Sequence, residues 1–185
     1  MTDQSFPVLE TPRLVLRQAR PGDVQRLFQV AQDEDVMCYF GTEPFESEQQ
    51  ALDAIDWQQR IWAEGTGVRW VITEPDHDAF IGDVGYFKFE RQHRRAEVGY
   101  LLEKAYWRRG LMTEAMTAVL DYGFVSMGLN RVEALVDPRN AASVGLLRKL
   151  GFVQEGLLRD YEFERGAFID LYMVSLLRRE WLNES

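Results

Sequence analysis

The stretch from Ala96 to Met116 reads AEVGYLLEKAYWRRGLMTEAM. Its first part, Ala96–Leu102, is typical of a strand, and an apolar helix begins directly after Gly110. No Ser, Asp or Asn precedes that helix to cap it, and two arginines stand before the glycine. A helix N-terminus leaves about four amide donors unpaired and carries partial positive charge. We therefore expect the amides around Arg109–Thr113 to hold a phosphate or pyrophosphate group.

A simpler interpretation of the same residues stays open. Thr113 would then be an ordinary N-cap, and the two arginines would be solvated, which an isolated motif this short allows equally well. Two other phosphate-binding motifs are missing from the sequence, G-x-x-x-x-G-K-[ST] and G-x-G-x-x-G. This argues against ATP in a P-loop and against a nicotinamide dinucleotide.

Length and charge narrow the class of protein. The 185 residues, 46% hydrophobic and 28% charged, predict one globular domain over residues 1–185 with a sizeable core. The net charge of -9 argues against broad binding to nucleic acid. An acidic surface favours cationic partners, although solubility alone also explains the charge.

Cys38 is the only cysteine, so no disulfide forms within the chain and a reducing, cytoplasmic location is expected. His77 and His93 are the only histidines, and no clustered metal site is predicted. The first ten residues lack the features of a secretion signal. No apolar run approaches the roughly 20 residues that span a bilayer, so we expect no membrane association.

The order of elements predicts an α+β, or mixed α/β, fold rather than a doubly wound one. Beyond Ala96–Leu102, strands are predicted at residues 13–18, 69–73, 79–90 and 131–136, and as a final pair that turns at Arg165–Gly166. Helices are predicted at residues 20–32, from Ser47 with a capping box to Gln50, at residues 111–127, and from Asn140 to a left-handed stop at Gly151.

Three segments carry a family resemblance: LETPRLVLRQARPGDVQRLF, AEVGYLLEKAYWRRGLMTEAM and RVEALVDPRNAASVGLLRKLGFVQEGLLRD. In this order they resemble the GNAT-superfamily N-acetyltransferases, in particular the RimJ/RimL-like branch of ribosomal-protein N-terminal acetyltransferases. The resemblance runs from Leu9 to about Leu177. It implies a central, twisted, mostly antiparallel sheet with one splayed strand pair, flanked by about four helices.

The resemblance implies that acetyl-CoA is the co-substrate and that no metal is needed. The pantetheine arm would lie between the strands at residues 97–102 and 131–136 and bind backbone groups of Tyr100, Leu101 and Leu102. The pyrophosphate would bind the loop and first helical turn formed by Trp107, Arg108, Arg109, Gly110, Leu111, Met112 and Thr113. Trp107 occupies a place usually held by Gln or Arg. Met112 replaces a small residue, so its side chain must point away from the phosphates.

The same resemblance assigns catalytic roles. Asn140 would cap its helix and also meet the pantetheine. Ser143, in the first turn, would protonate the leaving thiolate, although an exposed serine is also common there. Glu162 falls at the place of the general base, and Glu97 on the cofactor strand is the second candidate. Each carboxylate has the plainer interpretation of a surface residue on a strand.

The expected reaction is direct attack of a primary amine on the thioester, without a covalent acyl-enzyme. An α-amino group has a pKa of about 8 and is about one-tenth neutral at pH 7, whereas a lysine amine is neutral about once in 2,500. A base that takes up the proton would help both, and the resemblance implies a protein N-terminus as one expected acceptor. Two alternatives are a small amine, such as a polyamine, amino acid or drug, and a non-catalytic acyl-CoA-binding protein. A homodimer through the C-terminal hairpin is also expected.

Overall fold

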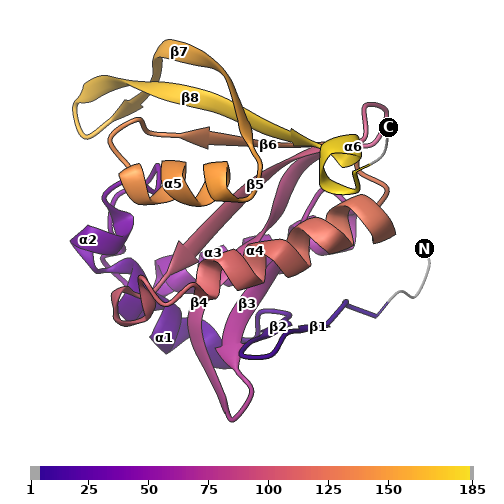
Figure 1. The fold of residues 1–185 in the computed structure, drawn as a ribbon. Coiled ribbons are helices and arrows are strands. Elements are labelled where there is room, and N and C mark those ends of the chain that lie inside the picture. The colour runs from indigo at the N-terminus through magenta and orange to yellow at the C-terminus, as the bar shows by residue number, and fades with distance from the viewer. Residues whose placement is uncertain (1–4, 184–185) are drawn as a thin grey trace.

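The computed structural model describes residues 5–183, and its centre is one eight-stranded sheet (Figure 1). The strand order is β1-β2-β3-β4-β5-β6-β8-β7, and every neighbouring pair is antiparallel except β5 with β6. The strands are β1 Leu9–Glu10, β2 Val15–Arg17, β3 Val68–Glu74, β4 His77–Glu90, β5 Arg95–Leu102, β6 Arg131–Val136, β7 Val153–Glu164 and β8 Ala167–Leu177.

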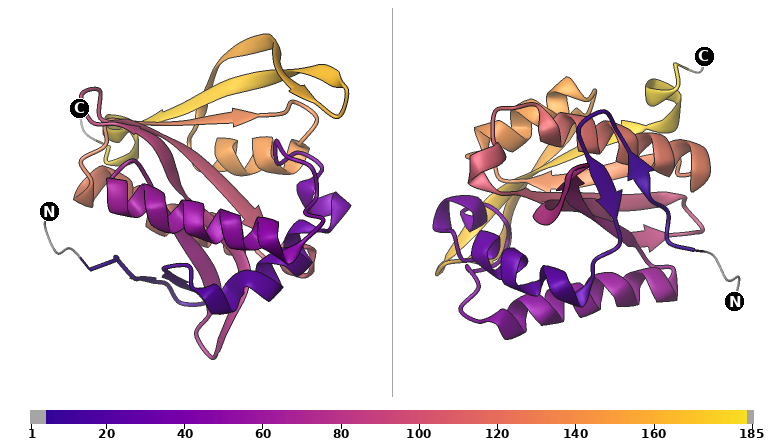
Figure 2. Two further views of the ribbon diagram at one scale, coloured as in Figure 1. Left: turned by 180° about the vertical axis from the view of Figure 1, so that it is seen from behind. Right: turned by 90° about the horizontal axis from the view of Figure 1, so that it is seen from below.

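Helices cover both faces of the sheet, with α1 and α3 on one face and α4 and α5 on the other (Figure 2). The α-helices are α1 Val24–Ala31, α2 Glu34–Met37, α3 Glu48–Glu64, α4 Leu111–Asp121, α5 Ala141–Lys149 and α6 Arg178–Trp181. Two 3₁₀ turns, Pro21–Asp23 and Lys104–Tyr106, precede α1 and α4. No helix within residues 5–183 is long and apolar enough to cross a bilayer.

The predicted fold class is confirmed, and most predicted strands agree with the structure within two residues. The hairpin turns at Arg165 and Gly166, whose φ angles of 48° and 80° give the left-handed backbone of a tight turn. The short strand β1 and the one-turn helices α2 and α6 were not predicted, because four or fewer residues show no periodicity. The helix predicted to reach residue 127 ends at Asp121 and continues as a π-helical segment, Tyr122–Ser126.

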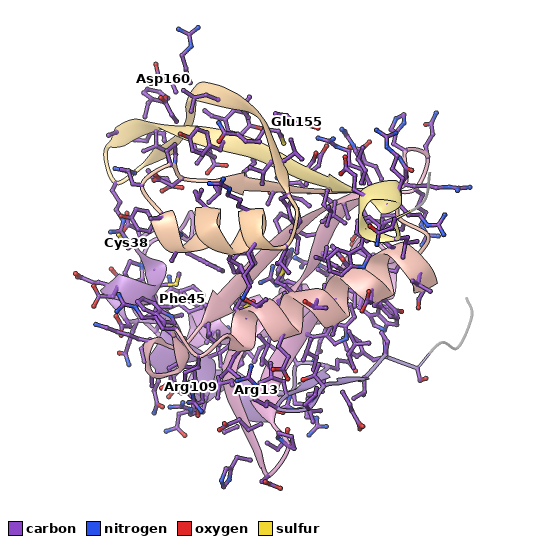
Figure 3. All side chains as sticks on the ribbon, in the orientation of Figure 1. Arg13, Cys38, Phe45, Arg109, Glu155 and Asp160 are labelled. Atoms are coloured by element: carbon purple, nitrogen blue, oxygen red, sulfur yellow. The ribbon has the colours of Figure 1, made fainter. Side chains whose placement is uncertain are left out.

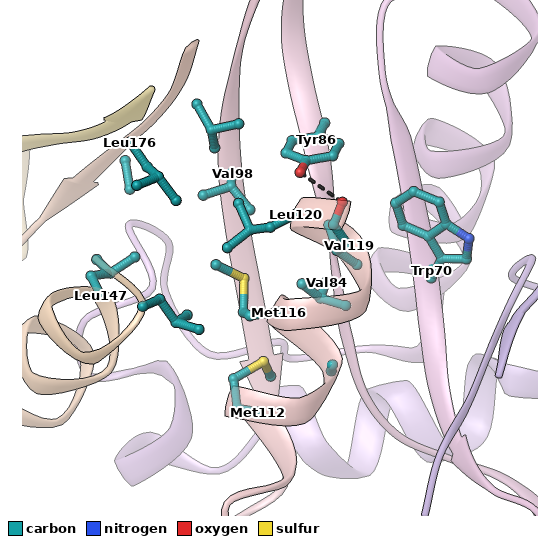
Figure 4. Close-up of a cluster of buried hydrophobic side chains, with 14 of the residues drawn as sticks. Trp70, Val84, Tyr86, Val98, Met112, Met116, Val119, Leu120, Leu147 and Leu176 are labelled. Atoms are coloured by element: carbon teal, nitrogen blue, oxygen red, sulfur yellow. Dashed lines mark hydrogen bonds between the residues drawn. The ribbon is translucent and has the colours of Figure 1, made fainter. Parts of the chain in front are cut away.

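The main core lies between the sheet and helices α4 and α5 (Figure 4). Helix α4 turns one continuous apolar face to the sheet, and this face consists of Leu111, Met112, Ala115, Met116, Val119 and Leu120. These side chains pack with Val84 and Val98 of the sheet and with Leu147 of α5. Burial of this face fixes the position of the N-terminus of α4 relative to β5.

A second core lies on the opposite face, under α1 and α3. Because side chains alternate along a strand, β5 contributes to both cores. Leu101 belongs to the second core, whereas Val98 is part of the main core and Tyr100 packs against it. The side chains that follow Glu97 therefore reach both sides of the sheet.

Strands β5 and β6 form the one parallel pair, and they separate soon after they meet. Their register contains only three pairs: Arg95 with Arg131, Ala96 with Val132, and Glu97 with Glu133. Beyond Glu97 the edge of β5 that faces β6 is unpaired. The predicted splayed strand pair is thus confirmed.

Two glycines with different surroundings, Gly123 and Gly145, allow a test of how tightly the core is packed. A Cβ on Gly123 would lie 2.4 Å from the hydroxyl of the fully buried Tyr86, and this hydroxyl donates a hydrogen bond to the carbonyl of Val119 at 2.9 Å. We expect Gly123→Ala to lower the free energy of unfolding by about 1 to 3 kcal/mol, as overpacking does. Gly145 in α5 has no atom within 4 Å of its virtual Cβ. Gly145→Ala should therefore raise that free energy by about 0.5–1 kcal/mol. Urea unfolding measures both, and equal effects would contradict this packing.

Candidate active site

A large cavity of about 1470 Å³ opens where β5 and β6 separate. One end is formed by the loop before α4, and the other by the β7–β8 hairpin and the segment that follows α2. In Figure 3, Arg109 marks the start of α4, Asp160 marks the β7–β8 hairpin, and Cys38 and Phe45 mark the segment that follows α2. Strand β5, strand β6 and helix α5 supply the walls between these ends.

The start of α4 has no side-chain cap, as the sequence predicted. Gly110 is the N-cap, with a left-handed φ of 76°, and no side chain caps the helix. Leu111, Met112 and Thr113 line the cavity, so the first amides of the helix lie beside it. The Glu114 carboxylate, also in the first turn, is turned away and accepts hydrogen bonds from Thr11 and Arg13. An anion in the cavity is thus the natural partner for these amides.

The conformation of this loop is fixed from outside the cavity. Arg13 donates a hydrogen bond from Nη1 to the carbonyl of Arg109 at 3.0 Å. Arg108 has a φ of 60°, a left-handed conformation that costs a non-glycine residue about 1 to 2 kcal/mol. The rest of the fold offsets this strain, which is a common property of ligand-binding loops.

The two arginines before Gly110 have different surroundings. Arg108 lines the cavity, but Arg109 does not; its guanidinium lies 5.2 Å from the ring centre of Tyr106 and 4.0 Å from the Glu74 carboxylate. Sequence alone cannot separate these neighbours, since the loop geometry decides which side chain points inward. We therefore expect only Arg108 to contribute its side chain to anion binding.

The side chains of the other predicted loop residues hold the loop in place. The Trp107 indole donates a hydrogen bond to the carbonyl of Leu102 at 2.8 Å, which ties the loop to the end of β5. The Met112 side chain is buried in the main core, as expected for a side chain that points away from the phosphates (Figure 4). The backbone of both residues stays beside the cavity.

The start of α5 brings the predicted Asn140 and Ser143 to the cavity wall. Asn140 is the N-cap, and its Oδ1 accepts a hydrogen bond from the Ser143 amide at 3.0 Å. The Ser143 hydroxyl lies 2.5 Å from the hydroxyl of Tyr100, which reaches across from β5. Burial raises the pKa of Tyr100 to about 12, although its hydrogen bond with Ser143 acts in the opposite direction. The sequence singled out only the backbone of Tyr100, so its hydroxyl is an additional polar group at this wall.

Two carboxylates of β7, Glu162 and Glu164, line the far end of the cavity. A bulge between Leu158 and Glu162, with Asp160 at a φ of 50°, changes the register just before them. Burial and the neighbouring Glu162 carboxylate raise the pKa of Glu164. Within residues 5–183 neither carboxylate forms an ion pair. Glu164 was missed by the sequence analysis, although residues i and i+2 of a strand share a face.

Glu97, the second predicted base, has different surroundings. It lies on the wall of the cavity, but Lys88 Nζ contacts its carboxylate at 2.8 Å. The same contact raises the pKa of Lys88. A carboxylate engaged by an ammonium is a weaker proton acceptor than a carboxylate without a cation. Lys88 also interacts with the charge of Glu162, but only Glu97 is in direct contact with it, and this contact favours Glu162 over Glu97 as the base.

A buried polar cluster completes the wall on the α3 side. Arg69 and Asp83 form an ion pair, and Gln58 Nε2 donates to the same carboxylate at 3.2 Å. The Arg69 guanidinium lies 5.8 Å from the ring centre of Trp57 and 6.0 Å from that of Phe87. No sequence pattern indicates this cluster, because its members lie on three separate elements. No group of three or more metal-ligating side chains is found in the described range.

Known proteins resemble this chain over nearly all of its length. The family model of the acetyltransferase (GNAT) domain matches residues 13–153. The uncharacterized N-acetyltransferase p20 of Bacillus licheniformis is 42% identical over 173 residues, which cover 94% of this chain and 97% of that protein. The putative ribosomal N-acetyltransferase YdaF of Bacillus subtilis is 27% identical over 92% of this chain and 94% of that protein.

A solved structure gives the same result for the fold. Spermidine N-acetyltransferase from Vibrio cholerae, in complex with CoA and spermine, has a TM-score of 0.82 at 25% identity and covers 94% of this chain and 100% of its own. The uncapped start of α4 beside a cavity between parted strands fits the acetyltransferase fold that these comparisons show. The chain belongs to the GNAT acetyltransferases and is an acetyl-CoA-dependent N-acetyltransferase.

Proposed function

We propose that this enzyme acetylates the α-amine of a peptide or protein N-terminus, with Glu162 as the base. The observation that carries the proposal is the pair of carboxylates, Glu162 and Glu164, that line the cavity without a salt bridge in the described chain. They lie at the end opposite the loop before α4, where an acceptor amine would enter. A carboxylate there attracts a protonated amine and can take its proton.

Acetyl-CoA fits the remainder of the cavity. The amides of Leu111–Thr113 and the Arg108 side chain would hold the diphosphate. The edge of β5 that β6 leaves beyond Glu97, at Tyr100–Leu102, would bind the pantetheine arm as an added strand binds, although the Leu102 carbonyl already accepts from Trp107. The thioester would then lie near Ser143 at the start of α5. These placements use the unpaired backbone that the fold leaves at both positions.

The reaction then needs no covalent enzyme intermediate. Glu162 takes a proton from the acceptor ammonium, directly or through one water, and the neutral amine attacks the carbonyl carbon. The new C–N bond forms and the C–S bond breaks, with the electron pair going to sulfur. Ser143 donates a proton to the thiolate, the nitrogen releases its second proton to water, and the serine regains a proton from water as free CoA leaves. Asn140 keeps Ser143 in place through the cap of α5.

A polyamine is the second candidate acceptor, and the same carboxylate pair favours it. Two neighbouring carboxylates that form no salt bridge in the described chain suit an acceptor that carries more than one positive charge. The spermidine acetyltransferase with a similar fold acts on such a molecule by its name. An α-amine, however, is neutral at pH 7 about 250 times more often than a lysine-like amine, which makes it the easier nucleophile.

Thiol release from acetyl-CoA separates these acceptors. The matched set is a lysine-containing peptide with a free N-terminus, the same peptide with its N-terminus acetylated, and spermidine. We expect release with the free peptide and loss of at least 90% of it, about tenfold, when the terminus is blocked. Thiol release with spermidine but with neither peptide would show that the acceptor is a polyamine and not a peptide N-terminus. Equal release from both peptides would place the reaction on the lysine side chain and contradict the proposal.

A further inference from the structure

We propose that Tyr100 is a positioning residue for Ser143, and that the two hydroxyls form a proton relay that ends at the departing thiolate. In this arrangement Tyr100 donates to the Ser143 oxygen, which leaves the Ser143 hydrogen available for sulfur. The inference rests on the proposed role of Ser143 and extends it to a residue on the opposite wall of the cavity.

The contact joins the two walls of the cavity. Tyr100 is the third residue after Glu97, the last β5 residue paired with β6, and its ring packs against the main core. Its hydroxyl meets Ser143 Oγ at 2.5 Å, while the amide of Ser143 is held by Asn140 at 3.0 Å. The serine is therefore fixed from the helix through its backbone and from the strand through its side chain.

Each hydroxyl is the other's only side-chain partner among the hydrogen bonds of the described residues. A phenol, with a pKa of about 10 in water, is a far stronger acid than an aliphatic hydroxyl, so Tyr100 is the natural donor. Its burial keeps it a neutral phenol throughout the physiological range. Ser143 accepts that bond, and its own hydrogen stays free to point into the cavity.

Two protons move together when the thiolate leaves. As the C–S bond breaks, its electron pair goes to sulfur, and sulfur takes the hydrogen of Ser143 Oγ. The serine oxygen takes the hydrogen of Tyr100 in the same event, so a serine alkoxide does not accumulate. The tyrosine then regains a proton from water in the open cavity. Without Tyr100, a lone serine would have to release its proton with no replacement within reach.

The test uses Y100F, S143A and the double variant, with acetyl-CoA and the amine that gives the fastest thiol release. We expect Y100F to lower kcat about 10- to 100-fold, with the Kd for CoA unchanged, and S143A to lower it at least as much. The double variant should be no worse than S143A alone, because both changes remove one pathway. Unchanged kcat in Y100F, or losses that multiply in the double variant, would overturn the inference.

Solvent isotope effects separate a relay from a merely structural role. In mixtures of H₂O and D₂O, the wild-type kcat should depend on deuterium content along a curve, because two hydrogens move together, and Y100F should give a straight line. A straight line in the wild type would count against the relay. The control is Y122F, which removes a part-buried hydroxyl outside the cavity, beside Trp70, and should keep wild-type kcat. Absence of thiol release from the wild type would instead refute the proposed function.

Discussion

Glu162→Gln is expected to lower kcat about 100- to 10,000-fold, the usual contribution of a general base. The side chain lines the end of the cavity opposite the loop before α4 and has no ion-pair partner in the described chain. Glutamine keeps the shape of the side chain and its hydrogen-bonding capacity but cannot take a proton. The affinity for acetyl-CoA should stay unchanged, because Glu162 is far from the amides that follow Gly110. Steady-state kinetics and calorimetric titration measure the two quantities separately.

The matched variant for this prediction is Glu97→Gln. Glu97 also lines the cavity, but its carboxylate is engaged by Lys88 at 2.8 Å. We expect its loss in kcat to be about tenfold or less, which corresponds to about 1.4 kcal/mol. A larger loss in Glu97→Gln than in Glu162→Gln would assign the base to β5 instead of β7.

Arg108→Gln is expected to raise the Kd for CoA about 10- to 100-fold, because a hydrogen bond to a charged group contributes about 1.5–3 kcal/mol. Arg108 lines the cavity beside the uncapped start of α4, and its strained backbone aims the side chain there. The loop itself should keep its conformation, since Arg13 holds the carbonyl of Arg109 and not the side chain of Arg108. Calorimetry with CoA at fixed ionic strength measures this effect.

Its control is the adjacent Arg109→Gln, which removes the same charge one residue away. The Arg109 side chain lies against Tyr106 and Glu74, outside the cavity. We expect a rise in Kd of about fivefold or less, as for the loss of an exposed ion pair. Similar losses in both variants would mean that general positive charge, and not a contact of Arg108, attracts CoA.

The sequence predicted the parts of the site that depend on backbone. The missing cap before α4, the capping role of Asn140 and the turn at Arg165–Gly166 are all local features, and the structure shows each of them. The separation of β5 and β6 followed from the family resemblance. Local sequence determines these features because the chemistry of a cap or turn lies within about four residues.

Features that depend on distant contacts could not be predicted in the same way. The bond between Tyr100 and Ser143 joins residues 43 positions apart, and the cluster of Gln58, Arg69 and Asp83 draws on three elements. The contrast between Arg108 and Arg109 depends on a left-handed backbone at Arg108 that a sequence does not reveal. These contacts arise only when α4, α5 and the sheet are packed together.

The most direct test of the account is a crystal structure of the protein with bound CoA. We predict that the diphosphate accepts hydrogen bonds from the amides of Leu111–Thr113, and that the sulfur lies between β5 and β6 within reach of Ser143. CoA bound at another surface of the folded protein, or a diphosphate remote from the start of α4, would contradict the account.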